Sequence, residues 1–241
     1  MKKTEGKNPE TANSVTIQGL AYSCEIRDTA PGRVLAFMEI STAAQDVRQD
    51  GTVEYSNWLR HRVAVAASGA KAEKLRDIAL KCRANKESYG SKDFVPSKIP
   101  VAVRGEFAVN DSGQQLVTVK EDALEFPEKL RMRNSITFAG TLVETTHNDL
   151  YATAVLRSKT SDGRDVLLPM IIYNNDNPKA WADLAGGKVK KGDTVSTTGP
   201  LISKRYNGTG GKEIFRCSIN ADKYAVTRKL TTRKTQSAQS I

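Results

Sequence analysis

Hydrophobic and polar residues alternate over several short segments in the first half of the chain, a pattern typical of half-buried β-strands. In segment 14–20, Val15, Ile17 and Gly19 share one parity. The period changes over 71–82, where apolar residues recur three or four positions apart and predict a short amphipathic helix. The other strands expected in this half are 34–40, 61–67, 101–109 and 115–120, the last two joined by a hairpin turn at 110–113.

The same order of elements begins again after Pro127. Segment 136–142 (ITFAGTL) parallels segment 15–20 (VTIQGL), and each has a glycine near the end of the strand. The remaining elements of this half are strands at 151–157, 165–173, 193–201 and 213–220, with a helical turn at 179–184. The two halves therefore predict an internal duplication at a spacing of about 120 residues.

Each half reads strand, strand, strand, short helix, strand, strand, which is the order of the OB-fold, a five-stranded and partly open Greek-key barrel. We therefore predict an all-β protein with short helices, built from two tandem OB-fold barrels. A pair of small SH3-like barrels is the alternative, which the position of the helix disfavours. The expected division is a disordered arm at 1–13, a first barrel at 14–127, a linker at 128–134, a second barrel at 135–227 and a flexible basic and polar tail at 228–241.

The formal net charge of +10 indicates a polyanionic partner, most often nucleic acid, because neutralising phosphates releases condensed counterions. The excess is concentrated near the end of the chain. From Leu201 onward nine basic residues are opposed only by Glu213 and Asp222, so this segment carries seven of the ten net charges. Charge does not separate DNA from RNA, and a basic surface that only confers solubility is the alternative.

The sequence carries no motif of a common enzyme class: it lacks a P-loop, GxGxxG, HExxH and GxSxG. Cys24, Cys82 and Cys217 have no metal-site spacing, and their odd number fits reduced thiols in a cytoplasmic protein. No apolar run reaches the roughly 18 to 20 residues that a membrane span needs, and the basic start lacks the apolar core of a secretory signal. We expect a non-catalytic cytoplasmic protein with no metal, no cofactor and no membrane contact.

A hairpin expected at 201–216 combines the two kinds of side chain that bind a single strand without sequence preference, cations for phosphates and aromatic faces for bases. Glycines at its turn leave it free to close over a strand. The alternative is a solvated hairpin whose phenylalanine points into the barrel. The candidate residues of this hairpin are Lys204, Arg205, Tyr206, Lys212, Phe215 and Arg216.

In the first half, Trp58, Arg60 and Arg62 share one strand parity and predict a face for stacking and phosphate contacts, with His61 and Val63 on the other side. A tryptophan inside the barrel is the alternative. The hairpin at 108–117 lacks basic residues, so the first barrel is expected to bind more weakly there or to contact a protein. The further candidates in the second half are Tyr151, Arg157 and Tyr173, whereas Trp181 is expected to pack in the core.

Segment 191–226 resembles the second half of the bacterial-type single-stranded DNA-binding protein domain, with its lysine-glycine turn, its strand ending in glycine, its basic and aromatic hairpin and its final strand. Trp58 and His61-Arg62-Val63 resemble the tryptophan-histidine-arginine-valine strand of that family, with Leu59 and Arg60 in between. The resemblance implies that Trp58 stacks on a base and that the chain coats and protects single-stranded DNA during replication, recombination or repair.

Proteins of this family commonly assemble four barrels, which implies a homodimer for a chain with two. The family normally ends in an acidic tail with a hydrophobic tip that recruits partner enzymes. This chain ends in RKLTTRKTQSAQSI, which is basic and then polar, so recruitment of partners by that route is not expected. An OB-fold scaffold that docks proteins and an RNA-binding OB-fold protein are the two alternative functions, because a fold does not determine a function.

Overall fold

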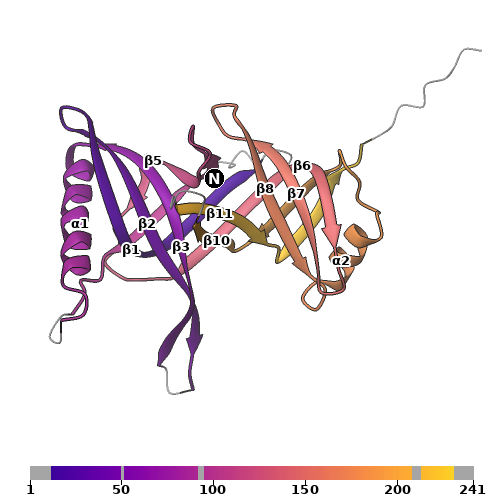
Figure 1. Ribbon diagram of the computed structural model, residues 1–241, viewed down its shortest axis with the longest axis horizontal. Helices are drawn as coiled ribbons and strands as arrows, with labels where there is room; N and C mark the ends of the chain where they lie inside the picture. Colours follow the sequence, from indigo (N-terminus) through magenta and orange to yellow (C-terminus); the bar gives the residue numbers. More distant parts are fainter. Residues whose placement is uncertain (1–11, 50–51, 92–94, 208–212, 231–241) are drawn as a thin grey trace, which may run out of the picture.

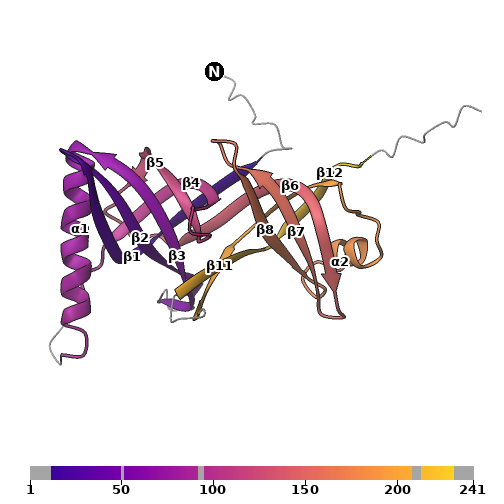
Figure 2. The ribbon, with the colours of Figure 1, turned by 45° about the horizontal axis from the view of Figure 1, so that its top comes forward.

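The computed structural model describes residues 12–49, 52–91, 95–207 and 213–230. Two β-barrels lie side by side along the long axis of the molecule (Figure 1). A helix lies at each end: α1 packs on the first barrel and α2 on the second, and Figure 2 shows the same arrangement after a turn of 45°. The predicted fold, two tandem OB-fold barrels with short helices, is confirmed.

The first barrel closes in the strand order β1-β2-β3-β5-β4-β1. The pairing of β3 with β5 is parallel and every other pairing in this barrel is antiparallel. The helix lies between the third and fourth strands, as the sequence predicts. The elements of the first barrel are β1 (Asn13–Ala30), β2 (Arg33–Val47), β3 (Val53–Ser68), α1 (Gly69–Glu87), β4 (Pro100–Val109) and β5 (Gln115–Glu125).

The second barrel repeats this plan, but its fourth and fifth strands are each broken into two pieces. Pro200 separates β9 from β10, and residues 221–222 separate β11 from β12. The β9–β12 half of this long ribbon closes the barrel against β6, and the β10–β11 half extends toward the first barrel. The elements are β6 (Arg133–His147), β7 (Tyr151–Lys159), β8 (Asp165–Tyr173), α2 (Pro178–Ala185), β9 (Thr194–Gly199), β10 (Leu201–Asn207), β11 (Glu213–Asn220) and β12 (Lys223–Arg228).

Alternation along the strands fills each barrel. On β2, Val34, Ala36, Met38 and Ile40 are fully buried, and the residues between them are only half-buried. Burial of such apolar side chains, at roughly 25 cal/mol per Å² of apolar surface, is the main source of stability in a barrel of this kind. Helix α1 covers one end of the first barrel with Ala72, Leu75, Ile78 and Cys82.

The two barrels are equivalent copies. The side-chain amide of Asn13 donates to the carbonyl of Phe107 and accepts from its N–H, at 2.8 and 2.9 Å. The side chain of Asn134 makes the same two bonds to the backbone of Leu201, at 2.8 and 3.1 Å. Asn13 and Asn134 therefore occupy the same position in the two copies, 121 residues apart, which agrees with the predicted duplication.

Strands β1 and β6 pair antiparallel and join the two barrels into one continuous sheet. Asn13 pairs with Phe138, and Ile17 pairs with Asn134. Because Asn134 is equivalent to Asn13 and Phe138 is equivalent to Ile17, the same two positions pair in both directions. The contact is isologous, with a pseudo-twofold axis between Val15 and Ile136.

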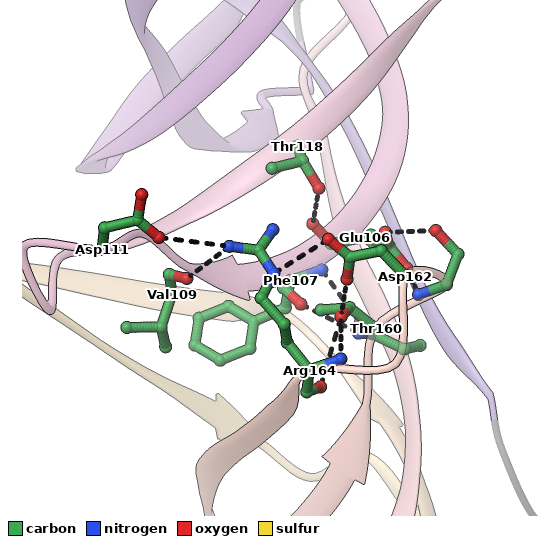
Figure 3. A network of polar contacts seen from close by, with 10 residues as sticks. Glu106, Phe107, Val109, Asp111, Thr118, Thr160, Asp162 and Arg164 are labelled. Atoms are coloured by element: carbon green, nitrogen blue, oxygen red, sulfur yellow. Dashed lines mark hydrogen bonds and ion pairs between the residues drawn. The ribbon is translucent and has the colours of Figure 1, made fainter.

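A second set of polar contacts ties the turn between β7 and β8 to the first barrel (Figure 3). The carboxylate of Glu106 on β4 accepts hydrogen bonds from the N–H and hydroxyl of Ser161, at 2.8 and 2.7 Å. Arg164 donates to the carbonyl of Val109 and lies 3.9 Å from Asp111. These bonds hold the two barrels together through residues that are distant in sequence from the β1–β6 pairing.

Two elements are longer than predicted. The helix expected at 71–82 extends over Gly69–Glu87, because its last turn is held by Asn85, whose side chain bonds twice to the backbone of Ser97. The first strand, expected at 14–20, continues to Ala30 and forms a hairpin with β2. Its outer part faces solvent and α1, so the residues there do not alternate strictly. β6 begins at Arg133, and the expected division into an arm, two barrels, a linker and a tail remains a prediction.

Candidate nucleic-acid interface

The outer face of β3 carries Trp58, Arg60 and Arg62. Trp58 is 51% exposed, and the two arginines are half-buried. His61 and Val63, on the opposite face of the strand, are both 0% exposed. This alternation is what a β-strand requires, so Trp58 lies on the surface and not in the core, and it shares that surface with two cations.

Trp58 lies at the base of a finger in which β2 and β3 run on together beyond the barrel (Figure 1). The register shifts between Thr42 and Ala44, and on the opposite strand Asn57 has a φ of 51°, in the left-handed region. Tyr55, further along the finger, is also exposed, and its ring centroid lies 5.9 Å from that of Trp58. The finger thus carries two neighbouring aromatic rings in solvent.

Tyr22 on β1 extends the same surface. Its side chain is 52% exposed, and the guanidinium carbon of Arg60 lies 3.5 Å from the centre of its ring, a close cation–π contact. Sequence reasoning missed Tyr22 because it lies just beyond the end of the predicted first strand. The sequence feature that could have identified it is an aromatic residue close to the end of that predicted strand.

The β10–β11 hairpin has two different faces. Lys204 pairs with Arg216, and Tyr206 is exposed with the guanidinium of Arg216 5.9 Å from its ring centre. These three predicted residues all face solvent. Lys212 and the glycines at positions 208, 210 and 211 lie outside the described residues. The exposed face of the hairpin therefore offers one aromatic ring and two cations.

The opposite face of the hairpin packs on the first barrel. Phe215 is only 3% exposed, and the guanidinium carbons of Arg62 and Arg205 lie 5.5 and 5.3 Å from the centroid of its ring. Arg205 also forms an ion pair with Glu39 of β2. The expectation that Phe215 faces a bound strand is therefore not met: two arginines cover it, and it fills the contact between the barrels.

A buried histidine lies under this contact. His61 is within hydrogen-bonding distance of Thr42 through Nε2, at 2.8 Å, and of Ser203 of the second barrel through Nδ1, at 3.1 Å. Burial without a compensating charge lowers the pKa of His61 to about 4. The ring is therefore neutral at pH 7 and joins the two barrels through hydroxyl groups.

Neighbouring residues complete this buried layer. The hydroxyl of Ser203 lies 3.5 Å from the sulfur of Cys217, and burial raises the pKa of the Cys217 thiol to about 11. The N–H of Cys217 donates to the side-chain carbonyl of Gln115 on β5, at 2.6 Å. A thiol with a raised pKa is a poor nucleophile, so these groups hold the hairpin in place and do not form a reactive centre.

The predicted residues of the second barrel form a separate group. Tyr151 and Tyr173 are cross-strand partners on β7 and β8, exposed, with ring centroids 6.2 Å apart. Arg157 is exposed on the same face of β7, where it lines a shallow groove together with Lys191. Trp181 is partly buried against the core and donates from Nε1 to the carbonyl of Asn148, at 3.0 Å.

The parts of the chain that the structure describes contain no group of three or more histidine, cysteine, aspartate or glutamate side chains that could hold a metal ion. Over the same residues, neither helix has the length and apolar character needed to cross a bilayer. What the arrangement offers is exposed aromatic rings beside arginines, which can stack on flat groups and neutralise phosphates.

No family model matches the sequence, and no curated protein matches it. Solved structures do. A deletion variant of the single-stranded DNA binding protein from Thermus aquaticus has a TM-score of 0.58 at 17% identity, covering 95% of this chain and 100% of that chain. For the wild-type protein the TM-score is 0.56 at 16% identity, with 93% and 97% covered. A mitochondrial single-stranded DNA binding protein from S. cerevisiae covers 40% of this chain and 98% of its own, at 15% identity and a TM-score of 0.35. The chain thus has the two-barrel fold of the Thermus aquaticus single-stranded DNA binding protein.

Proposed function

We propose that the protein binds single-stranded DNA with little sequence preference, and coats and protects it during replication, recombination or repair. The observation that carries the proposal is the row of Trp58, Arg60 and Arg62 on the outer face of β3, with the neighbouring side chains of His61 and Val63 buried beneath it. A ring and two guanidiniums on one face of a strand are the groups that a single strand needs.

Exposed rings favour a single strand over a duplex, because only unpaired bases are free to stack on side chains. Tyr22, Tyr55, Trp58 and Tyr206 are all exposed and all lie near arginines or near one another. Each stack contributes roughly 1 to 3 kcal/mol, largely independently of the base. The net charge of +10 adds an attraction to phosphates that weakens with salt. The fold shared with a protein described as binding single-stranded DNA is consistent with this role.

In the second barrel, the proposed contacts are Tyr151, Tyr173 and Arg157 on the β7–β8 face, and Lys204, Tyr206, Lys212 and Arg216 on the hairpin. Arg205 and Phe215 act indirectly in this proposal, because their side chains hold the hairpin against the first barrel. The strand would cross both barrels, with the hairpin between them.

The test is a titration of the full chain with a fluorescent oligo(dT) of about 35 nucleotides at two salt concentrations, with duplex DNA and oligo(U) as competitors. We expect tight binding that weakens with salt, quenches tryptophan fluorescence and resists the duplex. Equal competition by duplex DNA would mean that the protein binds only as a non-specific polycation. Preference for oligo(U) would assign the protein to RNA, and absence of any binding would favour a protein-docking scaffold.

We further propose that two chains associate, giving four barrels in one assembly. Light scattering coupled to size exclusion should then give twice the mass of the chain. A monomer mass at micromolar concentration would contradict this part of the proposal and leave the binding role intact.

A further inference from the structure

A groove of about 380 Å³ lies on the outer face of the first barrel, beyond the residues proposed above to bind the strand. Its floor is apolar and is formed by Leu35 and Phe37 of β2, Ala64 of β3 and Leu116 of β5. The turn between β4 and β5 and Arg164 of the second barrel close one side of it. The aromatic ring of Phe37 is only half-buried.

The groove continues the row of proposed contacts. On the outer face of the β2–β3 pair, Ser41 lies opposite Arg60, and Glu39 lies opposite Arg62. The next pair on this face is Phe37 opposite Ala64, in the groove. Successive pairs on one face of a strand are about 7 Å apart. Phe37 therefore lies one pair beyond Glu39 and Arg62, the pair on which Arg205 and Phe215 of the β10–β11 hairpin pack.

The cation at the edge of the groove is already neutralised. Arg164 donates to Asp162 at 2.8 Å and lies 3.9 Å from Asp111 (Figure 3). Two carboxylates beside one guanidinium leave no surplus positive charge there to bind a phosphate. Asn110 and Ser112 supply neutral polar groups on the same rim. The groove thus fits a flat uncharged group with polar edges.

A cation does lie over the ring of Phe37 itself. The guanidinium carbon of Arg27 on β1 is 5.2 Å from the ring centre, and this side chain is exposed. The groove therefore offers an apolar floor with an arginine beside it. These two features match the two parts of one nucleotide, a flat base and a phosphate.

We infer that this groove is a base-binding subsite, in which Phe37 and Ala64 receive one nucleobase of the bound single strand and Arg27 contacts an adjoining phosphate. The inference rests on the proposed function, since it assumes that a single strand is bound. It commits the groove to a nucleobase because Phe37 lies on the same face of the β2–β3 pair as Arg60 and Arg62, and because Arg164, the cation among its lining residues, is paired with carboxylates.

The test uses the full chain, an oligo(dT) of about 35 nucleotides containing 5-iodouracil, ultraviolet crosslinking and mass spectrometry of the crosslinked peptides. In the unmodified protein we expect crosslinks at Phe37 as well as in the finger around Trp58. Ala64→Leu adds three carbons to the floor and should abolish the Phe37 crosslink while the finger crosslinks remain. It should also weaken binding by roughly 5- to 100-fold, the range for loss of one stacked base.

Two controls separate a filled groove from a damaged fold. Ala84→Leu makes the same change on the exposed surface of α1 and should leave the affinity unchanged. Phe37→Leu keeps an apolar floor without the ring, and should weaken binding without altering the slope of affinity against salt, because no phosphate contact is lost. Melting temperatures of all variants establish that each is folded.

The outcomes are distinct. Finger crosslinks without a Phe37 crosslink, together with normal binding by folded Ala64→Leu, would overturn the subsite and leave the proposed function standing. A changed salt slope in Phe37→Leu would also overturn it, since the groove would then hold a phosphate. No binding and no crosslinks in the unmodified protein would instead remove the proposed function.

Discussion

Glu39 of the first barrel and Arg205 of the second form an ion pair in the middle of the proposed binding surface. The guanidinium donates to both carboxylate oxygens from Nη2, at 3.1 and 2.9 Å, and the Glu39 side chain is only 13% exposed. Glu39 also lies opposite Arg62 on the sheet. One carboxylate is therefore placed beside Arg62, a cation that is proposed to bind a phosphate, and it also holds Arg205 against the first barrel.

Replacing this carboxylate should strengthen binding. Glu39→Gln keeps the shape of the side chain and removes its negative charge, so the cations around this position attract a phosphate more strongly. We expect the affinity for oligo(dT) to rise about fivefold, which corresponds to about 1 kcal/mol, and the log–log salt slope to steepen by about 0.7, the value for one more phosphate contact on a single strand. Glu73→Gln on α1 makes the same change in net charge and should have little effect. Weaker binding by Glu39→Gln would mean that the ion pair supports the site.

Fluorescence quenching should come from one tryptophan. The chain has two, Trp58 on the exposed finger and Trp181 beside α2, whose indole is bonded to a backbone carbonyl. Trp58→Phe should abolish the quenching by oligo(dT) and weaken binding by up to about tenfold, because a smaller ring stacks less well. Trp181→Phe should leave both the quenching and the affinity unchanged. Quenching that survives in Trp58→Phe would place the bound bases elsewhere.

The contact between the barrels should weaken in mild acid. The pKa of His61 in the folded protein is about 4, below the ordinary value of 6.5, so the unfolded chain takes up a proton first as the pH falls. The stabilising effect of neutral His61 is therefore complete above pH 6.5 and is lost progressively toward pH 4, by about 3 kcal/mol.

Urea unfolding at several pH values measures this loss. His61→Gln should be less stable at pH 7 because the bonds to Thr42 and Ser203 are disturbed, but its stability should change less between pH 6.5 and 4. His147 is the only other histidine and is exposed, so His147→Gln should keep the pH dependence of the original protein. An unchanged pH profile in His61→Gln would show that other groups cause the effect.

Each barrel should depend on a glycine in its fourth strand, where that strand pairs with the first strand of the barrel. A β-carbon on Gly105 would lie 2.1 Å from the carbonyl oxygen of Thr118, and one on Gly199 would lie 1.8 Å from that of Asn220. Gly105→Ala and Gly199→Ala should each lower the free energy of unfolding by about 3 kcal/mol, since backbone must move apart. Gly113→Ala, in an open turn with a φ of 78°, should cost only about 1 kcal/mol. Equal losses in all three variants, measured by urea unfolding, would contradict the steric argument.

Local patterns were enough to predict the barrels. Which face of an element meets the core determines the alternation around Val15 and Ile17 and the change of period at Leu75. That pattern can be read from neighbouring residues alone. The same reasoning correctly placed His61 and Trp58 on opposite faces of one strand. The predicted roles of the site residues in binding have yet to be tested.

Contacts between distant segments could not be predicted in this way. Phe215 and Arg205 have the composition of a nucleic-acid site, but they face the first barrel because the hairpin crosses from one copy to the other, and His61 meets Ser203 from 142 positions away. Tyr22 joins the surface only because a long β1 brings it beside Arg60. Such pairings depend on how the two copies dock, which alternation along one strand does not encode.

The isologous pairing of β1 with β6 means that one polypeptide encodes both halves of a symmetric contact separately. In an assembly of identical single-barrel chains, any substitution is imposed on every copy at once. Here a change in one barrel leaves the other untouched. The short hairpin without basic residues at 110–114 and the cationic β10–β11 hairpin are equivalent elements that carry different side chains. Joining the two barrels in one chain thus removes the requirement that both sides of the contact carry the same side chains.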